Sequence, residues 1–128
     1  MSEINWEELQ SSAVAAMNKA YAPYSNFPVG VAALTEDGRI VSGCNVENAS
    51  YGLGLCAECG LVSNLILTGR SILRAIYCVD ANGNALSPCG RCRQLLWEHS
   101  TPNTQFMTPD GPAPLSDLLP WAFGPENL

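Results

Sequence analysis

The two Cys-x-x-Cys pairs of this sequence constrain its fold more than any other feature. One pair is Cys56 and Cys59, the other is Cys89 and Cys92, and 29 residues separate them. This spacing is a strong indication of a metal site, and thiolate ligands favour zinc. The chain must therefore bring both pairs to one point. Two arrangements are open: a closed structural site with four cysteine ligands, and an open site that uses three and leaves one position for water.

The residues beside the cysteines favour the open site. Cys56 and Glu58 stand at the start of one predicted helix, and Pro88 and Cys89 stand at the start of another. Because Cα–Cβ bonds tilt toward the N-terminus of a helix, these side chains can converge on an ion beyond the helix ends. Zinc held by three thiolates carries net negative charge, which the two helix N-termini and hydrogen bonds from Arg93 to thiolate sulfur would offset. A closed structural site has no use for the glutamate, whereas a site that activates water does.

Length and composition indicate an acidic globular chain. Its 128 residues and mass of 13.7 kDa predict a single domain over residues 1–128. The net charge of −6 weighs against a nucleic-acid polymer as partner, because phosphate contacts dominate such binding. The N-terminal segment lacks the pattern of a signal peptide, and no apolar run reaches the ~18 residues that span a bilayer. We therefore expect a cytoplasmic protein without a membrane partner.

Hydrophobic periodicity predicts that helices and strands alternate along the chain. We expect helices at 6–20, 56–69, 90–98 and 115–119, and strands at 29–34, 39–44, 72–80 and 103–107. The turn residues at 35–38 join the first two strands into an antiparallel hairpin. This alternation is typical of a layered α/β domain.

Four stretches of the sequence resemble the small homotetrameric cytidine deaminases. They are CAE at 56–58 with PCGRCRQ at 88–94, APYSNFPVG at 22–30, GCNVENASY at 43–51, and LLPWAFGP at 118–125. Their order and spacing cover nearly the whole chain. The resemblance implies a three-layer α/β/α sandwich around a mixed sheet of about five strands. It also implies a homotetramer, and a hydrolase of pyrimidine salvage that converts free cytidine and deoxycytidine to uridine and deoxyuridine with release of ammonia.

The resemblance also assigns the catalytic groups. The ligands of one zinc ion per chain fall on Cys56, Cys89 and Cys92, and the proton shuttle falls on Glu58. In the implied mechanism, Glu58 takes a proton from the activated water and passes it to ring N3. It then carries a proton to the amino group that leaves from C4.

A further set of residues matches the family's contacts with the nucleoside. These are Phe27, Asn45, Glu47, Ala49, Tyr51, Ala57 and Phe123. Phe27 would pack on the pyrimidine ring, and Asn45 and Glu47 would hold the sugar hydroxyls. The backbone at Ala57 would contact the base, and Ala49 would lie near the 5′ end of the sugar. Tyr51 and Phe123 would reach the pocket of a neighbouring subunit.

One departure from the family keeps other functions open. Many members have arginine where Cys59 stands, and that arginine helps to neutralise the thiolates. The alternative is therefore a non-catalytic structural zinc module with four cysteine ligands. The Cys89-x-x-Cys92 pair also resembles a dithiol redox motif, and deamination of a nucleoside-like antibiotic is a related activity. We expect Arg91 to be solvated and Cys78 to be an ordinary buried thiol.

Overall fold

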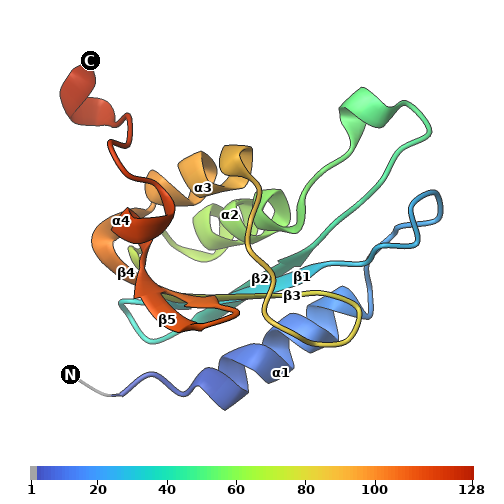
Figure 1. Ribbon diagram of the computed structural model, residues 1–128, viewed down its shortest axis with the longest axis horizontal. Helices are drawn as coiled ribbons and strands as arrows, with labels where there is room; N and C mark the ends of the chain where they lie inside the picture. The colour runs from blue at the N-terminus through green and yellow to red at the C-terminus, as the bar shows by residue number, and fades with distance from the viewer. Residues whose placement is uncertain (1–2) are drawn as a thin grey trace.

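The computed structural model describes residues 3–128 and contains one mixed sheet of five strands (Figure 1). The strands are β1 (Gly30–Thr35), β2 (Ile40–Cys44), β3 (Leu73–Val79), β4 (Ser100–Thr108) and β5 (Gly111–Pro114). Their spatial order is β2-β1-β3-β4-β5. Only the β3–β4 pair is parallel; the other three pairs are antiparallel. The mixed five-stranded sheet implied by the resemblance is thus confirmed.

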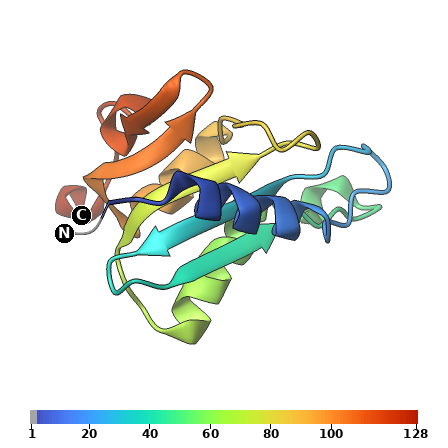
Figure 2. The same ribbon diagram turned by 90° about the horizontal axis from the view of Figure 1, so that it is seen from below.

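Helices cover both faces of this sheet. Helix α1 (Trp6–Met17) lies across one face, as the view from below shows (Figure 2). The opposite face carries α2 (Ala57–Thr68), α3 (Gly90–Trp97) and the short α4 (Leu115–Leu118) (Figure 1). Two single-turn 3-10 helices, η1 (Tyr51–Leu53) and η2 (Pro125–Asn127), lie outside the layers. The three-layer α/β/α sandwich is therefore also confirmed. Within residues 3–128, no helix combines the length and the apolar character that a membrane span requires.

The central strands are apolar on both sides because each face has its own core. Val31 of β1 and Cys78 of β3 belong to the core under α2 and α3. Ala32 of β1 and Val79 of β3 belong to the core under α1. Successive side chains of a strand point to opposite faces, so a strand covered on both faces reads as a continuous apolar run.

Gly43 sets the distance between α2 and the sheet. A Cβ at this position would collide with the backbone oxygen of Ala57 and the backbone nitrogen of Leu61, and would lie 2.9 Å from the carbonyl carbon of Gly60. The first turn of α2 therefore lies directly on the backbone of β2. This close approach fixes the N-terminus of α2, which carries Cys56 and Glu58.

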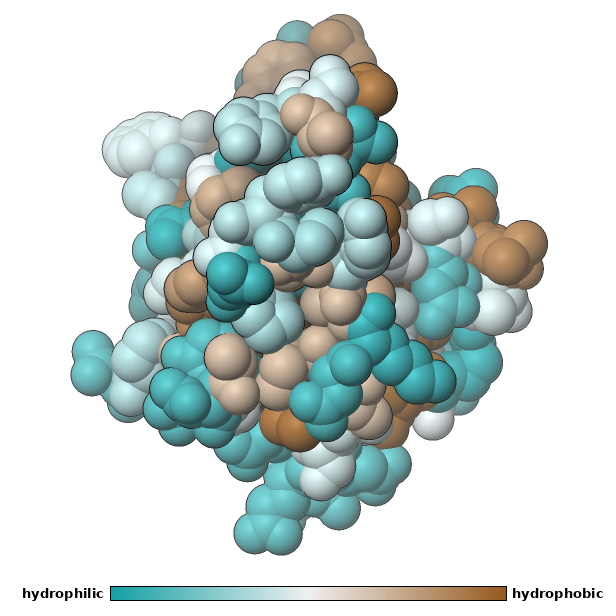
Figure 3. Space-filling view, turned by 90° about the vertical axis from the view of Figure 1, so that its right-hand side faces the viewer, coloured by the Kyte–Doolittle hydropathy of each residue, from teal (hydrophilic) through white to brown (hydrophobic). Residues whose placement is uncertain are grey.

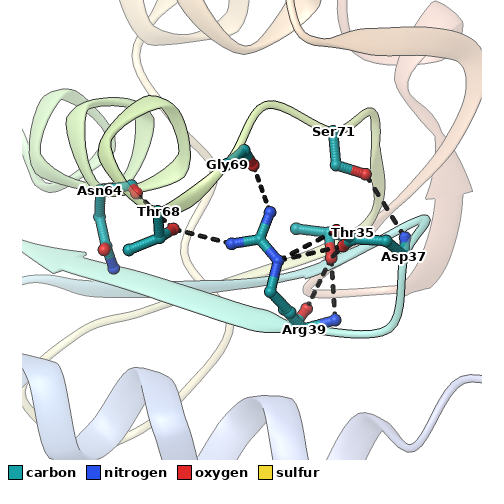
Figure 4. A network of polar contacts seen from close by, with 7 residues as sticks. All are labelled: Thr35, Asp37, Arg39, Asn64, Thr68, Gly69 and Ser71. Atoms are coloured by element: carbon teal, nitrogen blue, oxygen red, sulfur yellow. Dashed lines mark hydrogen bonds and ion pairs between the residues drawn. The ribbon is translucent and has the colours of Figure 1, made fainter.

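A polar cluster holds the other end of α2 (Figure 4). The Arg39 guanidinium donates to Thr68 Oγ1 at 2.7 Å and to the Gly69 carbonyl, and it pairs with Asp37 Oδ2 at 3.1 Å. A hydrogen bond from the Thr35 hydroxyl, together with Arg39, lowers the pKa of the Asp37 carboxyl. The β1–β2 turn is thereby tied to the C-terminus of α2, where a cation also complements the helix dipole.

Beyond shifts of one residue, the elements differ from the predicted ones in three places, and the first is β4, which begins at Ser100 instead of residue 103. Helix α1 ends at Met17 instead of residue 20, because the backbone of Tyr21 already pairs with Asn45 and Glu47. The sequence predicts no strand at 111–114, where β5 lies. Its sequence GPAP contains two prolines, which cannot donate hydrogen bonds, and it is tolerated because it lies at the edge of the sheet.

Candidate active site

Three cysteine sulfurs meet where α2 and α3 begin. Cys56 is the N-cap of α2 and Cys89 is the N-cap of α3, and Cys92 lies in the first turn of α3. Their Sγ atoms all lie within 4.8 Å of one another. Three sulfurs bound at about 2.3 Å to a tetrahedral zinc ion are about 3.8 Å apart, so this donor set fits zinc. A zinc ion is thus the cofactor that these residues support.

The electrostatics of the three thiols are unequal. Burial raises the pKa of Cys92 and of Cys56. Burial also acts to raise the pKa of Cys89, but hydrogen bonds outweigh it and leave that pKa below its ordinary value. The hydrogen bond that lowers this pKa most runs from the backbone N–H of Cys92 to Cys89 Sγ, at 3.4 Å. Such donors at a helix N-terminus favour the thiolate, which is the form that binds a metal ion.

Cys59 does not join the three sulfurs. The metal-ligating group found in residues 3–128 contains Cys56, Cys89 and Cys92 alone. The sulfur of Cys59 instead accepts a hydrogen bond from Arg91 Nη1 at 3.6 Å. This arrangement favours the open three-cysteine site over the four-cysteine structural module.

The two arginines next to the cysteines differ from what the sequence suggested. The sequence predicts that Arg93 donates to a thiolate, but its guanidinium donates hydrogen bonds to the backbone carbonyls of Pro88 and Leu118, both at 2.9 Å. It thereby ties the start of α3 to α4. Arg91 is exposed, as predicted, yet its guanidinium contacts a cysteine sulfur, and that contact raises its pKa. Which arginine reaches a sulfur is decided by the direction of each side chain from α3.

Glu58 is a buried carboxyl beside the metal-ligating sulfurs. It lies in the first turn of α2, and its side chain is only 4% exposed. Burial raises its pKa, and hydrogen bonds from its own backbone and from the thiols of Cys92 and Cys78 act in the opposite direction. The Cys78 thiol lies 3.9 Å from Glu58 Oε2. A carboxyl with a raised pKa is a stronger base than an ordinary one, which suits a group that accepts a proton and returns it.

These groups face one cavity of about 340 Å³. Seven of the predicted site residues line it: Phe27, Asn45, Cys56, Ala57, Glu58, Cys89 and Cys92. This volume lies at the lower end of the range for small-molecule sites. The buried thiol of Cys78 lines the cavity as well, which its position in an apolar strand did not predict.

Asn45 and Glu47 follow β2 and hold the loop that carries Phe27. The Asn45 amide donates to the carbonyl of Phe27 and accepts from the backbone N–H of Val29, both at 2.9 Å. The Glu47 carboxylate accepts from the backbone of Tyr24 at 2.9 Å. Glu47 lines a second hollow of about 400 Å³ next to Tyr24 and does not line the first cavity.

Ser25 supplies the remaining hydrogen bonds to the Glu47 carboxylate, and it is not among the site residues that the sequence predicts. Its backbone N–H donates to Glu47 Oε1 at 3.1 Å, and its hydroxyl donates to Glu47 Oε2. The hydroxyl has the largest effect in lowering the pKa of the Glu47 carboxyl. The sequence signal that points to Ser25 is its position in a loop flanked by prolines, two residues before an aromatic residue.

Ala49, Tyr51 and Phe123 lie away from the first cavity. All three are exposed, Tyr51 by 83% and Phe123 by 56%. The segment that carries Tyr51 and the C-terminal segment extend from opposite ends of the molecule (Figure 1). On the end seen in Figure 3, apolar groups interrupt a largely hydrophilic surface. Within one chain these aromatics therefore leave the cavity open.

The class of protein follows from a metal site with three thiol ligands, which leaves one coordination position free. The three sulfurs and the buried carboxyl of Glu58 face the same cavity. A structural zinc site is closed by four protein ligands, whereas zinc enzymes that activate water keep one position free beside a general base. Fold and site together define a zinc-dependent hydrolytic enzyme.

Comparison with known proteins narrows this class to one family. Residues 4–108 match the cytidine and deoxycytidylate deaminase zinc-binding region. A cytidine deaminase of Mycobacterium tuberculosis is 52% identical over 100% of this chain and 96% of its own length. The crystal structure of a cytidine deaminase from Mycobacterium leprae has 59% identity and a TM-score of 0.90, and covers 92% of this chain and 99% of that one. The structure from M. tuberculosis has 53% identity and a TM-score of 0.92, with 95% and 99% covered. This chain belongs to the cytidine deaminase family.

Proposed function

We propose that this protein hydrolyses free cytidine and deoxycytidine to uridine and deoxyuridine with release of ammonia. The observation that carries the proposal is the buried carboxyl of Glu58 in the same cavity as the three metal-ligating sulfurs. The names of the relatives support the substrate, since both mycobacterial proteins are called cytidine deaminases.

Cys56, Cys89 and Cys92 would hold the zinc ion, which supplies Lewis-acid activation of water. Glu58 accepts the proton that this water gives up, and donates it to ring N3, so that C4 becomes electrophilic. The water oxygen bonds to C4, and the Glu58 carboxylate then takes the remaining proton from the resulting C4 hydroxyl and passes it to the exocyclic amino group. The C4–N bond breaks to release ammonia while the C4 carbonyl of the product forms. The raised pKa of Glu58 suits both directions of transfer.

Residues in the cavity and next to it orient the nucleoside. Phe27 offers a flat apolar face to the pyrimidine at the mouth of the cavity, and the backbone of Ala57 lies beside the base. Asn45 and Glu47 supply the donors and acceptors that a sugar diol requires, and Ala49 lies toward the 5′ end. The two helix N-termini offset the negative charge of the thiolates, and Arg93, whose guanidinium binds backbone carbonyls, contributes through its positive charge and not through a hydrogen bond to sulfur.

The functional unit is a homotetramer of a single deaminase domain. Tyr51 and Phe123 complete the pockets of neighbouring subunits, which is supported by their exposure and by the open cavity of one chain. Six free cysteines fit a reducing compartment, and we place the protein in the cytoplasm, in pyrimidine salvage.

The test combines a metal analysis with a spectrophotometric assay. The purified protein should contain one zinc ion per chain, and incubation with cytidine should remove the ultraviolet absorbance of the 4-amino pyrimidine. Glu58→Gln should retain zinc and lose at least the ~10²–10⁴-fold that one general acid–base group contributes. A protein that binds zinc but forms no uridine would instead be a structural module.

A further inference from the structure

We propose that Ser25 is a positioning residue that joins sugar recognition and ring contact into one hydrogen-bonded unit. Its hydroxyl connects the Glu47 carboxylate to the backbone of Phe27. The inference rests on the proposed function, because that function places the sugar at Glu47 and the pyrimidine at Phe27.

The hydroxyl of Ser25 is used in both directions. It donates to Glu47 Oε2 and accepts from the backbone N–H of Phe27 at 3.0 Å. A serine hydroxyl has one proton and two lone pairs, so both bonds form at once. Alanine can form neither bond, whereas threonine can form both.

The peptide of Phe27 is held on both sides. Its N–H donates to Ser25, and its carbonyl accepts from the Asn45 amide at 2.9 Å. Asn26, which lies between Ser25 and Phe27 in the chain, has a φ of 56°, in the left-handed region that asparagine tolerates better than most residues. Phe27 is 52% exposed, so packing alone does not fix its position. The two hydrogen bonds fix the backbone from which its ring projects.

The carboxylate of Glu47 has one acceptor position left. A carboxylate offers about four lone-pair sites. Oε1 accepts from the backbone N–H groups of Tyr24 and Ser25, and Oε2 accepts from the Ser25 hydroxyl. The remaining site is on Oε2, where a sugar hydroxyl can donate. Ser25 thus holds the oxygen that binds the sugar in a single orientation before substrate arrives.

The experiment measures steady-state deamination of cytidine by the zinc-loaded protein and by Ser25→Ala, Ser25→Thr, Glu47→Gln and the Ser25→Ala/Glu47→Gln double variant. Loss of a hydrogen bond to a charged group should raise KM about tenfold in Ser25→Ala, with kcat within about twofold. Ser25→Thr should restore KM. Because Ser25 acts through Glu47, the double variant should have nearly the same KM as Glu47→Gln alone. Ser11→Ala, on the exposed face of α1, is the control and should match the unmodified protein.

Three results would overturn the role of Ser25: an unchanged KM in Ser25→Ala, a KM in Ser25→Thr as high as in Ser25→Ala, or losses that add fully in the double variant. These differ from failure of the proposed function. If Glu47→Gln raises KM and Ser25→Ala does not, only the role of Ser25 is wrong. If Glu47→Gln leaves KM unchanged, or the unmodified protein forms no uridine, both proposals fail.

Discussion

Gly43→Ala tests whether contact between α2 and β2 positions Glu58, the proposed proton shuttle. The three atoms nearest to the added Cβ would be backbone atoms of Ala57, Leu61 and Gly60, and none of them can rotate away. Ordinary contact begins at 3.4 Å, so α2 must move by about 1 Å from the sheet to make room. That displacement acts on the helical turn that carries Glu58.

The expected effect on activity is large and the effect on stability moderate. A misplacement of about 1 Å can reduce turnover about 100-fold, because proton transfer requires close alignment of the reacting groups. Overpacking of this kind also costs about 1–3 kcal/mol in the free energy of unfolding. The measurements are kcat with cytidine and the midpoint of urea unfolding, both on zinc-loaded protein.

Gly60→Ala is the matched control on the helix side of the same contact. A Cβ there would approach the nearest atom, Gly43 Cα, to 3.6 Å, which is ordinary van der Waals distance. Since alanine is also the better helix former, this variant should keep its activity and gain up to about 1 kcal/mol of stability. If Gly43→Ala keeps kcat within about threefold, or Gly60→Ala loses as much as Gly43→Ala, the positioning argument is wrong.

Three further predictions concern the metal ligands, a titrating carboxyl and the polar cluster. Cys59→Ser should retain zinc and Cys56→Ser should lose it, as metal analysis after dialysis would show; equal losses would instead indicate four ligands. The pKa of Glu47 is lowered below its ordinary value of 4.5, so its charged, hydrogen-bonded form is present above that pH and is lost as the pH falls through the lowered pKa. KM for cytidine should therefore rise only below pH 4.5, and a rise already near neutrality would contradict this assignment. Arg39→Met should remove the hydrogen bonds to Thr68 and Gly69. Because these bonds are partly solvated, the free energy of unfolding should fall by only about 1 kcal/mol, and KM should stay unchanged. A change in KM without a change in stability would place Arg39 in the substrate site.

The positions of the thiol ligands also explain why this fold needs two helices at one point. Cys56 and Cys89 are N-caps of α2 and α3, so each sulfur lies at the positive end of a helix. Glu58 shares the first turn of α2 with this charge. The arrangement that brings the negatively charged thiolates together near the metal therefore also stabilises their charge.

The sequence by itself determined which cysteines are candidate metal ligands, which glutamate is the candidate for proton transfer, and where most helices and strands lie. These depend on local pattern: cysteine spacing, the start of a helix, and the period of apolar residues. Strand β5 escaped this approach because proline-rich GPAP has no strand pattern of its own, and only the neighbouring edge of β4 makes it a strand.

Tertiary structure alone decided how the remaining side chains are used. Arg91 rather than Arg93 contacts a cysteine sulfur, and Glu47 faces a separate hollow while Ser25 bridges it to Phe27. Two of these pairings, Arg91 with Cys59 and Ser25 with Glu47, join residues more than 20 positions apart in the chain. They are set by where β2, α2 and α3 place their ends in space, and no local period in the sequence records that placement.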